Sequence, residues 1–467
     1  MLTSKKTYFD SIAPKRISQR RAKRYYWNDI TSYCNYFVHE DSSVLEIGCG
    51  TGELLQGLTA KRKTGIDISE AMISEAKKQF PELDVQVMAA EDIQLTEKFD
   101  LIILSNLIGY LDDIQLVLTK LHEVCHSETK IIITYYNFLW EPVLKFGEMV
   151  GYKTQSPNQN WLSLSEINDL LFLSGFNVYR NSRRMIFPVY IPLLSELLND
   201  FLGKFPFFRL LSINNFAFAK VMKVDSEKKY SVSVIIPARN ESGNIENAIL
   251  RMPSFGADTE LIFVESNSTD DTWTKILEVK NKFTNHKIHA VQIPEKGKNA
   301  AVQKGFEMAS NDILMILDAD LTVAPEDLTK FYTMMCSGKG DFINGCRLVY
   351  PMEKEAMRFL NRLGNKFFSS TFSWLLDQRF KDTLCGTKVI FRKDHIKLVR
   401  NRAFFGNFDP FGDFDLLFGA HKLNLCIIEL PIRYHERTYG RTNISRFKHG
   451  FILLKMCFFA ASKIKFR

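Results

Sequence analysis

Ile313-Leu314-Met315-Ile316-Leu317 is an apolar run that leads directly into Asp318-Ala319-Asp320, and a turn signal, Ala324-Pro325-Glu326-Asp327, follows it. Such a run indicates a buried strand that delivers Asp318 and Asp320 to the carboxyl edge of a sheet, where α/β proteins bind their ligands. Hard cations take carboxylate oxygens together with substrate phosphates. The pair therefore predicts a site for Mg²⁺ or Mn²⁺ that links the protein to a nucleotide diphosphate.

A repeated pattern of strand, polar loop and helix surrounds this motif. Residues 232–237 form a β-branched run that ends at a proline, and the polar loop after it opens a helix. A second strand, residues 260–265, is followed by a Ser/Thr/Asp-rich stretch that suits a helix cap. Residues 295–299 then place two lysines and a glycine before a helix over residues 300–309. Lysines and helix N-termini both favour phosphate.

These ordered motifs resemble the inverting family 2 glycosyltransferases of the GT-A fold, especially the branch related to dolichol-phosphate mannose synthase. The resemblance covers residues 230 to 450. One departure is that the family's usual V-D-D-G-S reads Val264-Glu265-Ser266-Asn267-Ser268, with a longer acid and no glycine. The resemblance implies a nucleotide-diphospho-sugar donor, a metal held by Asp318 and Asp320, and a donor site made of Pro237, Ala238, Arg239, Glu241, Glu265, Lys298, Asp318 and Arg347.

The same resemblance implies residues for the acceptor side. Residues 382–388 look like the family's element beside the acceptor, and residues 411–415 stand where these enzymes carry the acid proposed as general base. Asp413 is thus implied as the base, with Asp415 as the alternative, because a carboxylate in a cleft can deprotonate an acceptor. Segments containing Arg437 and Lys448 resemble the loop that closes over the donor and acceptor phosphates. The alternative for that loop is a solvated basic surface.

The N-terminal half carries an independent motif. A short apolar strand, residues 43–47, leads into Gly48-Cys49-Gly50-Thr51-Gly52 and a helical run from residue 53. Glycine allows the backbone to turn tightly and to approach a ligand where a Cβ would clash. The next strand, residues 63–67, ends in Asp67, an acid placed to hold ribose hydroxyls. The loop lacks the G-x-G-x-x-G spacing of nicotinamide dehydrogenases.

This half resembles the class I methyltransferases that use S-adenosylmethionine, over residues 40 to 222. Methyl transfer can be promoted by positioning alone and need not show a catalytic triad. Tyr135-Tyr136-Asn137 follows a strand at an edge where acceptors often sit, and simple packing is the alternative for these aromatics. The resemblance implies that the methionine end is lined by Glu46, Gly48, Gly50 and Gly52, the ribose by Asp67, and the adenine side by Glu91 and Asp92.

Length and composition agree with two catalytic domains. At 467 residues the chain is long enough for two units, each with its own core. We expect an α/β protein with two domains: a Rossmann-like methyltransferase fold with a seven-stranded, mostly parallel sheet over residues 1–222, and a GT-A fold over residues 231–467. Residues 185–211 form an apolar insertion in the first, and residues 223–230 form the linker.

Charge and hydropathy limit the partners. The net charge of +8 is spread along the chain without a nucleic-acid-binding motif, which argues against nucleic acid. Eight scattered cysteines without C-x-x-C spacing indicate reduced thiols. No secretory signal opens the chain, and no apolar run is long enough to span a bilayer. These features predict a cytoplasmic protein.

Two segments leave open a peripheral contact with the inner face of the membrane. Residues 15–27 combine basic pairs with Tyr25, Tyr26 and Trp27, and residues 185–211 are rich in Phe, Leu, Ile and Pro. Such patterns can lie in a lipid interface. The alternatives are a cap helix of the methyltransferase and an insertion packed over its cleft.

We therefore expect a bifunctional enzyme. One half transfers a sugar to a polyprenyl-phosphate, lipid or glycan acceptor, and the other methylates a small molecule or a sugar. One rival is a binding or scaffold protein with a degenerate ligand-sensing domain. Another is a nucleotidyltransferase, although residues 382–388 and 436–440 favour glycosyl transfer.

Overall fold

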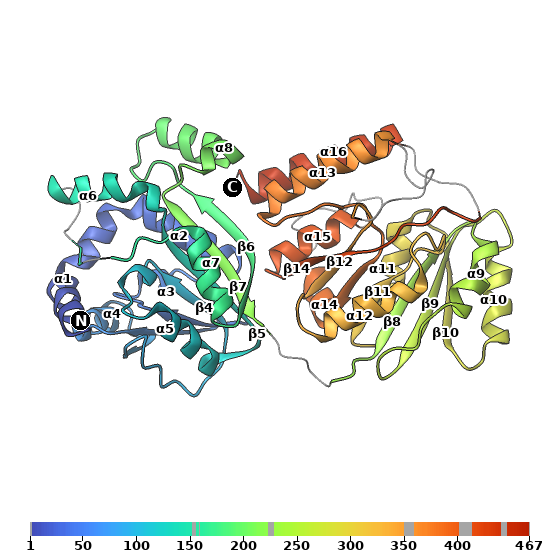
Figure 1. The fold of residues 1–467 in the computed structure, drawn as a ribbon, viewed down its shortest axis with the longest axis horizontal. Coiled ribbons are helices and arrows are strands. Elements are labelled where there is room, and N and C mark those ends of the chain that lie inside the picture. Colours follow the sequence, from blue (N-terminus) through green and yellow to red (C-terminus); the bar gives the residue numbers. More distant parts are fainter. Residues whose placement is uncertain are drawn as a thin grey trace. The chain divides into compact units, whose positions relative to one another are not determined.

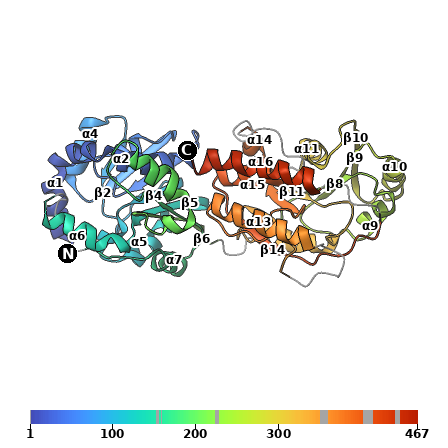
Figure 2. The ribbon, with the colours of Figure 1, turned by 90° about the horizontal axis from the view of Figure 1, so that it is seen from above.

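The computed structural model describes residues 2–151, 156–157, 159–222, 228–349, 359–400, 413–439 and 446–466. The chain divides into two compact units, Met1–Met222 and Lys223–Lys465. Figures 1 and 2 show that each unit is built from a twisted sheet with helices packed against it. Each unit is described separately below.

The N-terminal unit is built on a seven-stranded sheet in the order β3-β2-β1-β4-β5-β7-β6. All its strands are parallel except β7, which runs antiparallel to β5 and β6. Central strands are apolar on both faces because helices cover both sides. The strands are β1 (Ser43–Ile47), β2 (Arg62–Asp67), β3 (Asp84–Val87), β4 (Phe99–Ser105), β5 (Cys125–Tyr136), β6 (Phe176–Arg184) and β7 (Asn214–Val221).

Helices cover the two faces of this sheet. Side chains of α5 and α7 pack in one core cluster with alternate residues of β1, β4, β5 and β7. On the other face, the ring of Tyr33 in α2 lies against Phe216 and Phe218 of β7, with centroids 4.9 and 6.0 Å away. The helices are α1 (Leu2–Ala22), α2 (Arg24–Tyr36), α3 (Glu53–Gln56), α4 (Glu70–Gln79), α5 (Ile114–Lys120), α6 (Glu141–Met149), α7 (Leu164–Leu173) and α8 (Pro206–Arg209).

The C-terminal unit has a second seven-stranded sheet, in the order β10-β9-β8-β11-β13-β12-β14. Here β13 is antiparallel to both of its neighbours, and the other pairs are parallel. The strands are β8 (Val232–Ala238), β9 (Thr259–Ser266), β10 (Lys287–Ile293), β11 (Ile313–Ile316), β12 (Phe342–Cys346), β13 (Lys388–Phe391) and β14 (Ile427–Pro431).

Two core clusters lie on opposite faces of this sheet. Helices α11, α13, α15 and α16 pack on one face, and α9, α10 and α12 pack on the other. Neighbouring strand residues such as Ile235 and Ile236 point to opposite clusters, as the period of a strand requires. The helices are α9 (Ile245–Leu250), α10 (Thr272–Lys282), α11 (Lys298–Met308), α12 (Leu328–Cys336), α13 (Phe359–Leu376), α14 (Arg392–Arg400), α15 (Asp413–Lys422) and α16 (Arg446–Ile464).

These two sheets confirm the predicted fold class, and two local expectations are corrected. The strand expected to stop at Pro237 continues to Ala238. Proline is tolerated there because β11, the neighbour on one side, pairs only as far as Ile235 and needs no amide from Pro237. The helix expected from residue 300 begins at Lys298, so this lysine lies in the first turn of α11.

Candidate functional site

The carboxyl edge of the C-terminal sheet gathers charged residues from distant parts of the chain. Strands β8, β9, β11, β12 and β14 point the same way, so the segments that follow them meet at one edge. Glu241 follows β8, Asp318 and Asp320 follow β11, and Arg437 follows β14. Lys298 joins them from the start of α11.

Ion pairs connect these side chains. Lys298 Nζ lies 2.6 Å from Asp318 Oδ1. The guanidinium of Arg437 donates to Asp320 Oδ2 at 2.6 Å and to Glu241 Oε1 at 2.8 Å, so it bridges two carboxylates. The side chains of Asp320 and Arg437 are 14% and 26% exposed, which leaves the pair partly shielded from solvent. Each aspartate of the predicted metal site therefore faces a cation of the protein itself.

A glycine makes the first of these pairs possible. Gly386 comes just before β13, and a Cβ built on it would lie 2.0 Å from Asp318 Oδ2 and 2.1 Å from Lys298 Nζ. No side chain can stand at this position without pushing the lysine and the aspartate aside. This explains the place of Gly386 in the segment 382–388.

Glu241 has an unusual protonation equilibrium. Burial raises its pKa to about 7, and the Asp320 charge acts in the same direction, while Arg437 and a hydrogen bond from Asn244 oppose it. Its ordinary pKa is 4.5. Between these two values the folded protein holds a proton that the unfolded chain has released, so stability falls as the pH rises through this window.

We expect this effect to appear as a pH-dependent difference between the wild type and Glu241→Gln. Glutamine keeps an oxygen for the Asn244 amide but cannot ionise. Relative to the wild type, the variant should gain on the order of 2–3 kcal/mol of stability between about pH 5 and about pH 8. Denaturant unfolding at both pH values checks this, with the exposed Glu326→Gln as control. A difference between wild type and variant that stays constant with pH would contradict it.

The segment after β14 packs on the loop after β8. The Tyr439 hydroxyl lies 2.9 Å from Ser242 Oγ, and a Cβ on Gly243 would meet the Tyr439 ring at 2.6 Å. Thr438 Oγ1 donates to Asn244 Oδ1 at 3.3 Å. Arg437 is thus held over the acidic edge by the contacts of the two residues that follow it. Residues 440–445 lie outside the described residues.

Two donor-site residues of the sequence analysis, Glu265 and Arg239, have buried polar side-chain atoms. Glu265 is fully buried, and its carboxylate accepts hydrogen bonds from the Ser268 amide at 2.5 Å and from Gln292 Nε2 at 2.8 Å. Glu265 thereby fixes the position of Ser268. Ser268 Oγ in turn accepts a hydrogen bond from the Asn240 amide at 3.0 Å. Arg239 has a buried Nε with no hydrogen-bond partner.

Arg347 is held in a buried ion pair. Its guanidinium donates to both oxygens of Asp382 at 2.7 and 2.8 Å, and Asn365 donates to the same carboxylate at 2.9 Å. Asp382 is fully buried. Burial alone would raise the pKa of Asp382, but Arg347 and Asn365 hold it at about 2. Arg347 also lies over the Tyr434 ring, 5.1 Å from its centroid.

The remaining residues of this site are positioned as follows. Pro237 and Ala238 form the end of β8. Asp415 is buried in the first turn of α15. Asp413 begins α15 and Lys448 lies in α16, but the side chains of both fall outside the described residues.

The acidic edge fits a metal that also contacts substrate. Within the described ranges no group of three or more His, Cys, Asp or Glu residues is gathered as a complete metal cage. Mg²⁺ commonly uses one or two carboxylates together with substrate phosphates. Asp318 and Asp320 supply such a pair, and Lys298 and Arg437 supply cations for the phosphates.

The N-terminal unit places its glycine loop between β1 and α3. Gly48, Gly50 and Gly52 have φ of +72°, +54° and +81°, a backbone conformation that other residues rarely adopt. The Gly50 amide donates to Asp67 Oδ2, and the Ser69 amide donates to Asp67 Oδ1, both at 2.9 Å. Asp67 is therefore fixed beside the loop, which suits the ribose role that the resemblance implies. Burial raises its pKa.

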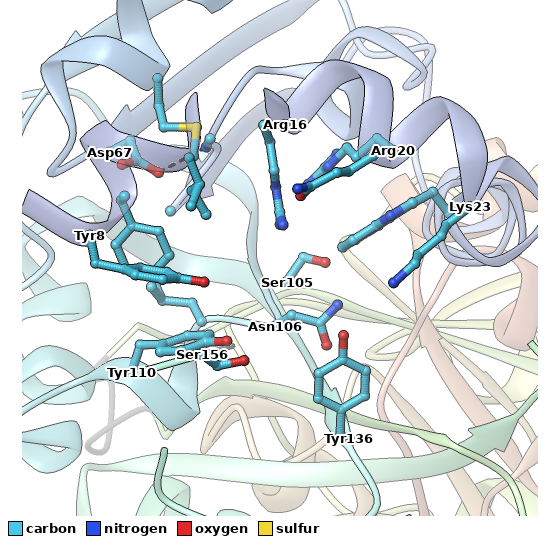
Figure 3. A pocket seen from close by; sticks show the side chains of 18 of the residues that line it. Tyr8, Arg16, Arg20, Lys23, Asp67, Ser105, Asn106, Tyr110, Tyr136 and Ser156 are labelled. Carbon is cyan, nitrogen blue, oxygen red and sulfur yellow. Dashed lines mark hydrogen bonds between the residues drawn. The ribbon is translucent and has the colours of Figure 1, made fainter. Parts of the chain in front are cut away.

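A cavity of about 330 Å³ opens beside this loop (Figure 3). Gly48, Gly50, Asp67 and Glu91 line it. The other three residues implied by the resemblance, Glu46, Gly52 and Asp92, are not among its lining residues. Glu46 is buried, its carboxylate oxygens have no hydrogen-bond partner, and burial raises its pKa to about 8.

The cavity is also lined by residues that the resemblance did not assign to the cofactor, among them Tyr136, which the sequence analysis placed either at an acceptor edge or in packing. Arg16, Arg20 and Lys23 enter it from the N-terminal helix and the turn after it, together with Tyr8 (Figure 3). Ser105 and Asn106 follow β4, and Tyr136 ends β5. The spacing of the three cations, four and three residues apart, puts them on one helix face and is a signal in the sequence. Tyr135, the neighbour of Tyr136, is buried in the core instead.

Comparison with known proteins assigns a class to each unit. Residues 45–131 match the family described as a methyltransferase domain, and residues 233–405 match glycosyl transferase family 2. Both units are therefore transferase domains. The chain carries a methyltransferase domain, which implies S-adenosylmethionine as its cofactor, followed by a family 2 glycosyltransferase domain that resembles dolichol-phosphate mannosyltransferases.

Several relatives of the C-terminal domain have named activities. A dolichol-phosphate mannosyltransferase of Pyrococcus furiosus is 35% identical over 29% of this chain and 38% of its own length. The enzyme of the same name from Saccharomyces cerevisiae is 36% identical over 21% of this chain and 39% of its own. The chain thus spans about two fifths of these relatives. A UDP-N-acetylglucosamine–dolichyl-phosphate N-acetylglucosaminyltransferase of Methanococcus voltae is 24% identical over 48% of this chain and 96% of its own.

Solved structures similar to the chain include methyltransferases. One is an S-adenosylmethionine-dependent methyltransferase of Thermotoga maritima, with 19% identity and a TM-score of 0.37, covering 46% of this chain and 98% of its own. Another is the magnesium protoporphyrin IX methyltransferase of Synechocystis, with 16% identity and a TM-score of 0.32, covering 47% of this chain and 99% of its own.

Proposed function

We propose that the C-terminal domain transfers a sugar from a nucleotide-diphosphate donor to a polyprenyl phosphate, with Mg²⁺ or Mn²⁺ held by Asp320 and Asp318. The observation that carries this proposal is the pairing of these two carboxylates with Lys298 and Arg437 at the carboxyl edge of the sheet. Such an edge offers acids for a metal and cations for a diphosphate. The names of the relatives, which act on dolichyl phosphates, support the choice of acceptor.

The proposed transfer is a direct displacement, so the protein forms no covalent bond with the sugar. An oxygen of the acceptor attacks the anomeric carbon of the sugar, and the bond to the nucleotide diphosphate breaks with its electron pair on the leaving oxygen. A divalent cation bound here stabilises that charge. Lys298 and Arg437 contribute further positive charge. Asp413, or alternatively Asp415, takes the proton when the acceptor is a hydroxyl, whereas a lipid phosphate is already an anion.

A transfer assay tests this proposal. The purified protein is incubated with radiolabelled UDP-, GDP- or dTDP-sugars, Mn²⁺ and a polyprenyl phosphate, and the organic phase is analysed. We expect one nucleotide class to yield a lipid-linked sugar and free nucleoside diphosphate. In a parallel incubation with nucleoside triphosphates and sugar 1-phosphates, release of pyrophosphate and formation of a nucleotide-sugar would show a nucleotidyltransferase instead. Metal-dependent binding without any product would favour a ligand-sensing domain.

We propose that the N-terminal domain methylates a small molecule or a sugar. The support is the glycine loop with Asp67 at one end of the cavity and further polar side chains at the other. S-adenosylmethionine supplies an electrophilic methyl group there. The nucleophile of the acceptor forms the new bond to carbon, and the electron pair of the broken bond stays on sulfur. The chain's own residues hold the two molecules in line.

Asp67→Asn is expected to weaken the binding of S-adenosylmethionine by about 10- to 100-fold. The carboxylate is fixed by two backbone amides, and loss of a charged hydrogen bond to the ribose costs about 1.5–3 kcal/mol. Isothermal titration calorimetry measures the affinity. Asp84→Asn, on the neighbouring strand and away from the cavity, is the matched control. Equal affinities of the wild type and Asp67→Asn would contradict the assignment of Asp67 to the ribose.

We infer a peripheral contact of the N-terminal domain with the membrane. In the apolar insertion, residues 185–211, the side chains of Leu193 and Phe207 are 82% and 74% exposed. Among the described residues, no helix combines the length and hydropathy needed to cross a bilayer. Flotation with anionic vesicles tests the contact, and retention by vesicles that is unchanged in the double variant Leu193→Ser/Phe207→Ser would argue against this surface.

A further inference from the structure

Three cations line one side of the cavity of the N-terminal domain. Arg16, Arg20 and Lys23 project into it from one face of α1 and the turn after it, opposite Asn106 and Tyr136 (Figure 3). Asp67 and the glycine loop line the cavity at the end away from Lys23, where the proposed cofactor binds, and the Arg16 charge reaches Asp67. Three of the basic residues of the segment 15–27 therefore belong to the cavity, in keeping with the cap-helix interpretation.

Arg20 and Arg16 differ in whether a carboxylate of the protein forms an ion pair with them. Arg20 pairs with Glu53 at 3.2 Å and lies over Trp27, 4.0 Å from the ring centroid. Arg16 also approaches Trp27, at 5.7 Å. No carboxylate in the described part of the chain forms an ion pair with Arg16. The Arg16 charge instead reaches the cavity: burial raises the pKa of Tyr8, and Arg16 opposes that rise.

The charge of the cofactor does not neutralise the positive charges of Arg16, Arg20 and Lys23. S-adenosylmethionine carries a sulfonium and an ammonium against one carboxylate, so its net charge is positive. The acidic residues that line the cavity are Asp67 and Glu91; two backbone amides hold Asp67, and the resemblance assigns both residues to the cofactor. Arg20 is buried and Arg16 is half-buried, whereas Lys23 is exposed, and cations removed from water require a negative partner. The second substrate is the component that can supply this charge.

Unpartnered polar atoms lie between the two ends of the cavity. Ser105 is 9% exposed, and its hydroxyl has no hydrogen-bond partner. The carbonyl oxygen of the Asn106 side chain is likewise buried without one. Buried polar groups are normally satisfied, so such atoms indicate a polar ligand. Asn106 has φ of +53°, a strained conformation typical of functional sites.

The wall beyond the cations is aromatic and apolar. Tyr26 and Tyr136 are stacked with centroids 6.3 Å apart, and Trp140 and Val143 of the α6 region continue the lining. Val143 is 55% exposed, so the apolar lining reaches the surface of the domain. Phe146, one turn further along α6, is 60% exposed. An apolar chain leaving the cavity would find a continuous surface here.

We propose that the methyl acceptor is an anionic amphiphile: its carboxylate or phosphate binds against Arg16 and Lys23, and its apolar part leaves the cavity over Trp140 and Val143. This inference rests on the proposed methyltransferase function and names the substrate class of that same site. Arg16 and Lys23 are binding residues in this assignment. Arg20, which forms an ion pair with Glu53, adds a third positive charge to this side of the cavity.

Calorimetric titration of the full chain saturated with S-adenosylhomocysteine tests the proposal without requiring turnover. The probes are decanoate, decyl phosphate and decyltrimethylammonium, each below its micelle concentration, together with acetate and inorganic phosphate. We expect at least one decyl anion to bind at least about 10-fold more tightly than the decyl cation and than the short anions. The two anionic arms distinguish a carboxylate acceptor from a phosphate acceptor.

Variants separate this inference from the function on which it rests. Arg16→Gln and Lys23→Gln should each weaken binding of the preferred decyl anion about 10-fold or more while changing the affinity for S-adenosylhomocysteine less than about 2-fold. Arg62→Gln, an exposed arginine paired with Glu97, is the control. Equal binding of anion and cation would overturn the proposal. So would loss of cofactor affinity in Arg16→Gln with the decyl anion still bound. Failure of the wild type to bind S-adenosylhomocysteine would refute the methyltransferase function itself, and the inference with it.

Discussion

Asp320→Ala is expected to abolish the metal-dependent binding of the donor and to lower the rate of sugar transfer by about 10³-fold or more. The carboxylate is the metal ligand of the proposal, and the metal stabilises the charge on the leaving diphosphate. Loss of such electrostatic stabilisation raises the barrier by about 4 kcal/mol, which corresponds to this factor. Thermal stabilisation by donor and Mn²⁺ measures binding, and the radiochemical assay measures transfer.

A matched control and a clear contrary result accompany this prediction. Asp258 lies just before β9, at the opposite edge of the same sheet, and forms an exposed ion pair with Lys287 at 3.3 Å. Asp258→Ala should leave donor binding and transfer unchanged. If Asp320→Ala keeps a Mn²⁺-dependent stabilisation by the donor, Asp320 is not a metal ligand. Its role would then be structural, through its pairing with Arg437 and its hydrogen bonds from Thr322.

Arg347→Met is expected to lower the free energy of unfolding of the C-terminal domain by about 3–5 kcal/mol. The substitution leaves the fully buried carboxylate of Asp382 without its cation, and an unpaired buried charge is costly. Arg251→Met is the control, because Arg251 forms a similar two-bond pair with Glu326 at 2.9 Å on the surface, where ion pairs contribute less than about 1 kcal/mol. Denaturant unfolding of both variants measures the difference.

This experiment also distinguishes the two roles open to Arg347. The family resemblance implies contact with the donor phosphates, whereas the structure shows a guanidinium committed to Asp382 and Tyr434. A variant with unchanged stability and a raised KM for the donor would support the phosphate contact. The expected loss of stability would make Arg347 a residue that holds the edge of the site in place.

The fold could be predicted from the sequence because its signals are local. The apolar run before Asp318 and the strand before the glycine loop each show a buried strand and the turn that ends it, and family matches to both halves confirm the classes. The prediction that the strand stops at Pro237 is wrong because the tolerance for proline depends on where the neighbouring strand β11 ends. That information lies about eighty residues away in the chain.

The composition of the sites was harder to predict because their contacts are not local. Arg437 and Glu241 are separated by 196 positions in the chain, and no sequence pattern in either segment predicts their ion pair. The burial of Glu265 and Asp382 follows from packing, so sequence alone could not show that their carboxylates face the protein interior. The cations of α1 could have been found from their helical spacing, but only the structure shows which surface they face.

Arg437 gives the glycosyltransferase domain a counter-ion of its own. Because this guanidinium is attached to the chain, its effective concentration at Asp320 is high, and a divalent ion arriving alone must compete with it. A metal that arrives together with a nucleotide diphosphate brings phosphate oxygens that can receive the displaced guanidinium. We therefore expect Mn²⁺ alone to bind weakly and Mn²⁺ with the donor to bind tightly, which paired titrations will show. Equal affinity for Mn²⁺ with and without the donor would exclude this exchange of cations.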